Sequence, residues 1–326
     1  MKSNLQPLIT PSLPMTAFIY VVFFGVWIGF YWLYDFPAEM KGFAGTFAES
    51  FLPSKSLIAS LITFAIVVLN SMIIAQMNNR FAIIRTRTFM PPFIYLLLSV
   101  CWLPAYGNYV AALGSMFVLL GLYLSLGMYK DKNVEIAFLS FFFLALSSFL
   151  IHEFVILTLI FWIGFAILNS FSGRVFFASV FGFLAPWILF FAIHYYFFNQ
   201  TFFIPQVQEF VLNFSLFGVD ALILFIYVII LIFVLVVSLF QITANSRQDS
   251  IQTRNILNFF KLLIISLSLL LIFRNSGFIS YLPLVAIVFS LITSYIFTLL
   301  KNTFNYIVFL VLCLSSFLIA FYLIIF

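Results

Sequence analysis

Two carboxylates follow the first long apolar run of the sequence. Asp35 and Glu39 are four residues apart, so on a helix their side chains would lie on one face. Such a pair could bind a divalent cation, or act as a general base on a substrate that enters from the outer leaflet. The alternative is that Asp35 caps a helix beginning at Pro37, because negative charge stabilises a helix N-terminus. Asp35 and Glu39 are the candidate catalytic residues.

Five further residues are candidates for substrate binding. His152 and Glu153 are adjacent between two apolar runs, where they form either a simple polar turn or a proton-carrying pair at the rim of a cavity. His194 and Asp220 lie near the ends of two other runs, and ionisable groups there tend to face the interior of a bundle. Arg274 either pairs with a neighbouring acid or holds a phosphate or carboxylate.

Other chemistry has no motif in this sequence. It contains no Walker or GxSxG motif, no basic and aromatic patch for nucleic acid, and no His/Cys cluster with metal-ligand spacing. Cys101 and Cys313 both lie inside apolar runs and are interpreted as small buried hydrophobic residues. The sequence therefore predicts no metal centre and no nucleic-acid partner, and it does not indicate a cofactor.

The composition identifies the environment of these residues. The chain has 326 residues, of which 65% are hydrophobic and 7% charged, and its mean hydropathy is +1.24. Soluble domains are roughly 45–50% apolar and about 25% charged. This composition excludes a water-facing globule, a disordered chain and a nucleic-acid-binding domain. The sequence predicts a membrane protein whose main partner is the lipid bilayer.

Apolar runs long enough to cross a bilayer recur along the whole chain. They are apolar on every side, whereas a membrane barrel needs segments of about ten residues with alternating polarity. We therefore predict an all-α, polytopic membrane protein with about eleven transmembrane helices in a single domain over residues 1–326. The predicted spans are Met15–Tyr34, Leu57–Met77, Thr88–Pro104, Tyr106–Met128, Val134–Ile151, Phe154–Phe171, Val175–Phe198, Phe217–Gln241, Leu257–Phe273, Phe278–Leu300 and Phe304–Phe326.

The distribution of cations over alternate connections predicts the orientation. One set of connections holds most of the 14 Lys and Arg residues, namely Lys2, Arg80, Arg85, Arg87, Lys130, Lys132, Arg174, Arg247, Arg254, Lys261 and Lys301. The opposite set holds only Lys41, Lys55 and Arg274. Cytoplasmic loops carry the excess of Lys and Arg, so we expect a cytoplasmic N-terminus and an outer C-terminus. Most acids fall on the predicted outer side.

Three connections are long enough for structure of their own. Residues 36–52 predict an amphipathic helix in the outer interface, residues 199–216 form an outer loop, and residues 243–256 form a solvated cytoplasmic linker. The first prediction depends on apolar residues spaced by three or four, which are Phe36, Met40, Phe43, Phe47 and Phe51. In the fourth span, Gly107, Ala111 and Ser115 recur every four residues. That face packs either within the chain or against a partner or second copy.

Two resemblances bear on function. The segment from Gly173-Arg174 through Gly182-Phe183 and Ala185-Pro186-Trp187 to Phe198 resembles an uncharacterised multi-spanning inner-membrane family of Bacteroidota, which implies location but no activity. Asp35 and Glu39 followed by an interfacial helix are similar in layout to membrane glycosyltransferases and polymerases that use polyprenyl-linked sugars. That layout implies a lipid-linked substrate at the outer leaflet, although those enzymes carry larger outer loops or an outer domain.

Three functions remain open. Short loops and the lack of a strong motif favour a cell-envelope membrane subunit or scaffold without catalytic activity. The outward bias of the acids, with Arg274 as a phosphate holder, favours a polyprenyl-linked-sugar glycosyltransferase or polymerase. A transporter of small molecules or lipids would need several ionisable residues deep within spans, and only His194, Asp220 and Lys261 come near this description.

Overall fold

The computed structural model describes residues 13–34, 56–198, 222–273, 278–299 and 303–325, and in these segments the chain is helical with no β-strand. Three short 3₁₀ helices join the α-helices: η1 (Leu103–Ala105), η2 (His152–Ile156) and η4 (Ser246–Gln248). The α-helices are α2 (Leu13–Leu33), α4 (Leu57–Phe81), α5 (Met90–Cys101), α6 (Tyr109–Gly127), α7 (Val134–Leu150), α8 (Leu157–Ile167), α9 (Gly173–Phe198), α10 (Leu222–Ala244), α11 (Ile251–Phe273), α12 (Phe278–Leu299) and α13 (Thr303–Ile325).

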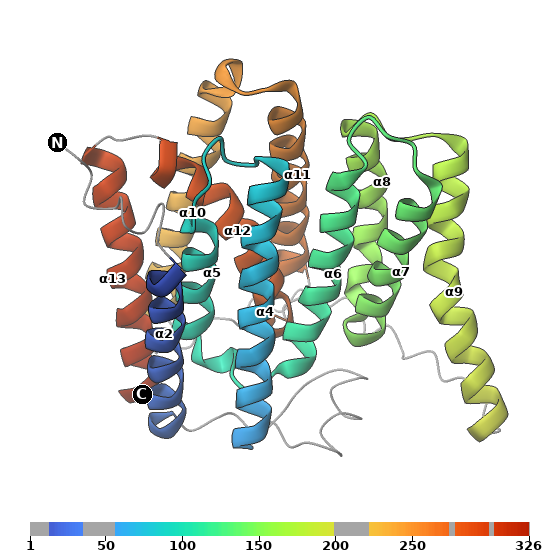
Figure 1. The fold of residues 1–326 in the computed structure, drawn as a ribbon. Helices are drawn as coiled ribbons and strands as arrows, with labels where there is room; N and C mark the ends of the chain where they lie inside the picture. Colours follow the sequence, from blue (N-terminus) through green and yellow to red (C-terminus); the bar gives the residue numbers. More distant parts are fainter. Residues whose placement is uncertain (1–12, 35–55, 199–221, 274–277, 300–302, 326) are drawn as a thin grey trace.

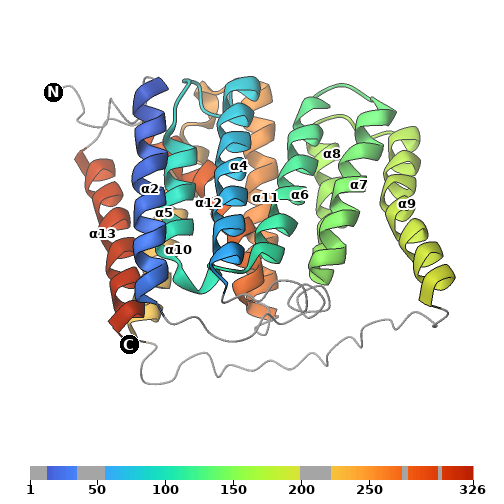
Figure 2. The ribbon, with the colours of Figure 1, turned by 60° about the horizontal axis from the view of Figure 1, so that its bottom comes forward.

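Successive helices run in opposite directions through one bundle (Figures 1 and 2). The connections that follow α4, α6, α8 and α10 lie together at one end, and those that follow α5 and α7 lie at the other. The prediction of an all-α polytopic fold is confirmed, because eight of the described helices are long and apolar enough to cross a membrane.

Three helices at predicted spans are shorter than a bilayer requires. They are Met90–Cys101, Val134–Leu150 and the η2–α8 unit His152–Ile167. A span takes about 20 residues, and a 12-residue helix such as α5 extends only about 18 Å. The short α5 is nevertheless at the centre of the bundle, where Ile94 and Tyr95 have no exposed surface. Its neighbours α4, α12 and α13 surround it.

Aromatic packing and local hydroxyl bonds fill the interior. Trp27 stacks on Tyr106 with ring centroids 3.5 Å apart, and its indole N–H donates to the Ser60 hydroxyl over 2.9 Å. Many buried hydroxyls donate to a carbonyl one turn earlier, as Ser115 does to Ala112 over 2.7 Å. Such bonds leave few unpaired polar groups in an environment that offers no water.

Glycines allow the closest helix contacts. A Cβ on Gly182 of α9 would overlap the backbone carbonyl of Phe138 in α7, and one on Gly164 of α8 would overlap the Phe259 ring of α11. Small residues in α6 act similarly, since a Cβ on Gly121 would lie 3.0 Å from the Ser140 carbonyl oxygen of α7. These contacts require the absence of a side chain.

The predicted small-residue face of the fourth span packs inside this chain. Ala111 and Ser115 of α6 are buried, and α6 contacts α4, α7 and α12. Gly107 precedes the helix and has a φ of 70°, a conformation that glycine adopts without strain. Packing within the chain, which was one of the two alternatives for this face, therefore accounts for Ala111 and Ser115.

The polar segment 243–256 differs from the predicted solvated linker. Helix α10 continues to Ala244, η4 follows, and α11 begins at Ile251, six residues before the predicted start of that span. The backbone hydrogen bonds of a helix can continue into polar residues beyond its apolar part. The change in polarity therefore did not mark where α10 ends or where α11 begins. The predicted interfacial helix 36–52 and the outer loop 199–216 lie outside the described residues.

Candidate functional site

Most of the predicted site residues fall outside what the structure describes. Asp35, Glu39, Asp220 and Arg274 lie outside the described residues, and His194 belongs to α9 without a described side chain. Their convergence on one outer site therefore stays a prediction. The nearby Trp187 of α9 is described, and it packs on α7.

Trp187 follows Pro186, which lies inside α9. The Trp187 ring centroid lies 4.3 Å from that of Phe149, and its indole N–H donates to Ser148 over 3.3 Å. This side chain fills the α7–α9 interface, which is a packing role.

His152 and Glu153 begin the short helix η2 between α7 and α8. The reversal is therefore longer than a two-residue turn, because the 3₁₀ helix runs to Ile156 and leads directly into α8. Both residues are partly exposed at the end of the bundle opposite the α10–α11 connection. The structure places these two candidates together, as their adjacency requires.

Cations gather at the other end, which we call the cationic end. Every described Lys and Arg lies in a connection at this end or in the helical turns beside it: Arg80, Arg85, Arg87, Lys130, Lys132, Arg174, Arg247, Arg254 and Lys261. Three of the described acids, Asp131, Glu135 and Asp249, lie there as well, and only Glu153 lies at the opposite end. The asymmetry in the sequence is thus an asymmetry between the two ends of the bundle.

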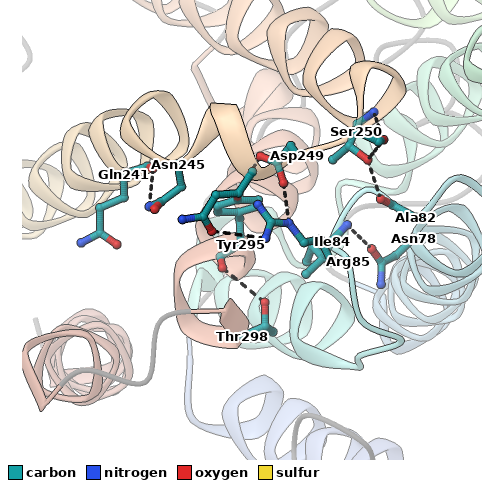
Figure 3. Close-up of polar contacts among 12 residues, drawn as sticks. Asn78, Ala82, Ile84, Arg85, Gln241, Asn245, Asp249, Ser250, Tyr295 and Thr298 are labelled. Atoms are coloured by element: carbon teal, nitrogen blue, oxygen red, sulfur yellow. Dashed lines mark hydrogen bonds and ion pairs between the residues drawn. The ribbon is translucent and has the colours of Figure 1, made fainter.

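The Asp249 carboxylate connects several chain segments at the cationic end (Figure 3). Arg85 donates from Nε to Oδ1 over 2.7 Å, and the Tyr295 hydroxyl donates to Oδ2 over 2.8 Å. Arg85 also donates from Nη1 to the Gln248 side chain over 3.5 Å. We call these four residues the polar clasp. It joins the α4–α5 connection, the α10–α11 connection and α12.

Asn78 holds the α4–α5 connection in the shape that presents Arg85. Its Oδ1 accepts the Ile84 backbone N–H over 2.9 Å, and its amide donates to the Thr86 carbonyl over 3.4 Å. Helix α4 ends at Phe81, and the next residue, Ala82, has a left-handed φ of 48° that reverses the chain. The buried Asn78 therefore replaces backbone partners that a loop at this position lacks.

The α10–α11 connection is fixed to the same loop by a second contact. The Ser250 hydroxyl accepts the Thr253 backbone N–H over 3.1 Å, as a helix N-cap does. The Thr253 hydroxyl in turn donates to the Ala82 carbonyl over 3.2 Å. Asp249 thus stands between η4 and a capped α11, with its carboxylate directed at Arg85 (Figure 3).

Burial and the charge of Asp249 act in opposite directions on Arg85. The Asp249 side chain is 1% exposed and the Arg85 side chain 34%. Removal from water by itself lowers the pKa of Arg85, but the hydrogen bond and charge of Asp249 outweigh this effect and raise the pKa above its usual value. Both carboxylate oxygens are occupied. The arrangement can hold chain segments together, and it offers no free nucleophile or base.

Comparisons with protein-family models, curated proteins and solved structures find no match to this chain. Its function must therefore be argued from its own residues. Within the part of the chain that the structure describes, no three His, Cys, Asp or Glu residues lie close enough to hold a metal ion.

Sequence reasoning did not identify the clasp. Arg85 and Asp249 are 164 positions apart, and in the sequence each is a single charged residue within a polar connection. One signal was present, since Asp249 is an acid inside a strongly basic set of connections. A lone carboxylate among cations is a candidate for ion pairing.

Proposed function

We propose that the protein is a multi-pass subunit or scaffold of a bacterial cell envelope, embedded in the inner membrane with a cytoplasmic N-terminus and eleven membrane-embedded helices. The observation that supports this proposal is the polar clasp, in which the buried side chain of Asp249 connects three separate parts of the bundle. A residue in such a position maintains the shape of the bundle. A scaffold needs a fixed shape.

The helices at the periphery of the bundle add to this proposal. The candidate spans in α2 and α10 have only 22% of their residues buried, and that in α9 has 28%, whereas the span in α12 has 72%. These peripheral helices thus present broad apolar faces to their surroundings. In a membrane such faces meet lipid or the helices of another protein, and contacts between helices there depend on packing.

Purification in a mild detergent tests the scaffold proposal. We expect the tagged chain to recover another membrane protein in a fixed ratio, and crosslinking in intact membranes before extraction to give the same pair. A monomer without a crosslinked partner under both conditions would overturn the proposal. The variant Arg87→Gln, at an exposed cation outside the clasp, serves as the matched control for the variant Arg85→Gln. If the shape of the cationic end matters, only Arg85→Gln lowers the recovery.

The glycosyltransferase or polymerase alternative depends on the outward bias of the acids that the sequence predicts, and Glu153 is the described acid at the end opposite the cationic end. In that case Asp35→Asn or Arg274→Ala abolishes assembly of an envelope glycan while the protein is still inserted at normal levels. Asp131→Asn, an acid at the cationic end, serves as the control. Unchanged glycans in both test variants would remove this alternative.

A further inference from the structure

One outward face of α11 carries two cations at different depths. Arg254, Asn258, Lys261, Ile265 and Leu269 follow one another at spacings of four, three, four and four, so they lie in one stripe along the helix. Arg254, Asn258, Ile265 and Leu269 are exposed, and Lys261 is partly exposed. We call this set the α11 stripe.

The opposite face of α11 packs into the bundle. Phe259 meets Gly164 of α8, and Phe260, Leu263 and Leu267 are buried in the same core. Since α11 contacts α8 and α12 with that face, the stripe is directed away from the protein. The first three turns of α11 belong to the cationic end (Figure 1), and the residues of the stripe that follow them are apolar.

The stripe changes from polar to apolar along the helix, as a helix does where it passes from headgroups into hydrocarbon. Arg254 and Lys261 are seven residues apart, about 10 Å along the axis. Helical side chains lean toward the N-terminus, and a long Lys side chain extends toward the interface, so the Lys261 ammonium rises toward the level of Asn258. Both cations can then approach one anionic group beside Asn258, while Ile265 and Leu269 line the hydrocarbon below it.

These cations differ from Arg85 in their surroundings. No described residue forms an ion pair or hydrogen bond with the side chains of Arg254, Asn258 or Lys261, whereas Arg85 is paired with Asp249. An unpaired cation at this depth is costly unless an anion from the surroundings neutralises it. The anion available at this depth is a lipid phosphate.

We infer that the α11 stripe binds the headgroup phosphate of an anionic phospholipid in the leaflet at the cationic end. Arg254 donates two N–H groups to the phosphate, Lys261 supplies a second positive charge, and the Asn258 amide donates to a phosphate or glycerol oxygen. The acyl chains lie along Ile265 and Leu269, which are 55% and 48% exposed. This apolar continuation favours a lipid over free phosphate.

Lipid binding by the purified full-length chain tests this inference. We measure its melting temperature in a neutral detergent with phosphatidylglycerol, with phosphatidylcholine, or with inorganic phosphate at the same concentration. Phosphatidylglycerol alone should raise the melting temperature. Native mass spectrometry then counts bound lipid. Arg254→Gln and Lys261→Gln should each weaken phosphatidylglycerol binding about five-fold, the effect of about one cation near a charged surface.

The matched control is Arg174→Gln, which removes a cation from α9 at the same end of the bundle and should leave lipid binding unchanged. Lys261→Met, which keeps the length of the side chain without its charge, separates lost charge from lost packing. A variant counts only if its melting temperature without lipid equals that of the unchanged protein. The inference is overturned if inorganic phosphate or phosphatidylcholine stabilises equally well, or if Arg174→Gln weakens binding as much as Lys261→Gln.

Discussion

At the scale of single residues, Arg85 and Asp249 differ in how much water each retains, and this difference determines what their substitutions do. The Asp249 side chain is 1% exposed, and the Arg85 side chain, which covers it, is 34% exposed. The carboxylate therefore depends on Arg85 and Tyr295 for the interactions that water would otherwise supply. Arg85 can still reach solvent when Asp249 is removed.

We predict that Arg85→Met is more harmful than Arg85→Ala. Methionine keeps the carboxylate covered but removes its cation, which should cost about 3 kcal/mol, whereas alanine lets water reach Asp249 and should cost about 1–2 kcal/mol. Equilibrium unfolding in mixed micelles measures both values. Arg87→Met, at an exposed cation of the same connection, should change stability by less than about 0.5 kcal/mol.

A double-mutant cycle makes this prediction specific to the pair. Asp249→Asn removes the charge but keeps an acceptor for Tyr295, so adding it to Arg85→Met should recover part of the lost stability. Strictly additive costs would contradict a direct interaction between Arg85 and Asp249.

The residues that sequence reasoning identified and those that it missed differ in sequence separation. Adjacent candidates such as His152 and Glu153 stay together in any fold. The partner of Asp249 lies 164 positions away, and only the packing of α4, α5, α11 and α12 brings the two together. The unpaired cations of the α11 stripe illustrate the same limit, because a one-dimensional pattern does not say which face of a helix is covered.

At the scale of elements, the glycine contacts set the distance between neighbouring helices. Gly182 meets backbone atoms of Phe138, which cannot rotate away, while Gly164 meets the end of the Phe259 side chain. A Cβ on Gly25 or Gly29 of α2 would have no described atom from outside its own helical turns within 4 Å. The three situations predict three different responses to one added methyl group.

We predict a graded response to Gly→Ala substitution. Gly182→Ala should cost about 3 kcal/mol because helix α9 must shift, and Gly164→Ala about 1–2 kcal/mol because a ring can adjust. Gly29→Ala should be neutral or slightly stabilising, since alanine favours a helix and its methyl group would not press on a neighbouring helix. Unfolding in mixed micelles measures all three. Equal losses at Gly182 and Gly29 would mean that helix spacing does not depend on Gly182.

Helix positions follow from the sequence better than helix lengths do. Each predicted apolar run corresponds to a helix in the described part of the chain, because only a helix satisfies every backbone group within one segment in lipid. The lengths of α5 and α8 were overestimated, since apolar flanks such as Trp102–Pro104 pack in the bundle without continuing the α-helix, whereas the bounds of α7 were predicted to within one residue. Hydropathy does not distinguish a buried loop from the buried end of a helix, because both are apolar.

At the scale of the whole molecule, the two ends of the bundle differ in charge. Every described Lys and Arg lies at the cationic end, and the described residues of the other end include Glu153 but no cation. Insertion retains Lys and Arg on the cytoplasmic side, so this asymmetry sets the expected orientation. In the proposed orientation, the α11 stripe lies in the cytoplasmic leaflet, where anionic lipids give a negative surface potential.

We predict that Lys132 faces the cytoplasm and Glu153 the outer compartment. Cys101 and Cys313 are first replaced by alanine, and Lys132→Cys or Glu153→Cys is then introduced singly. In intact bacterial spheroplasts a membrane-impermeant maleimide should label Glu153→Cys, and it should label Lys132→Cys only after the membrane is opened. Leu159→Cys, an exposed position within the apolar α8, should resist labelling in both states. The reverse pattern would invert the orientation, whereas labelling of both polar sites from one side would mean that α7 does not cross the membrane, as its 17 residues permit.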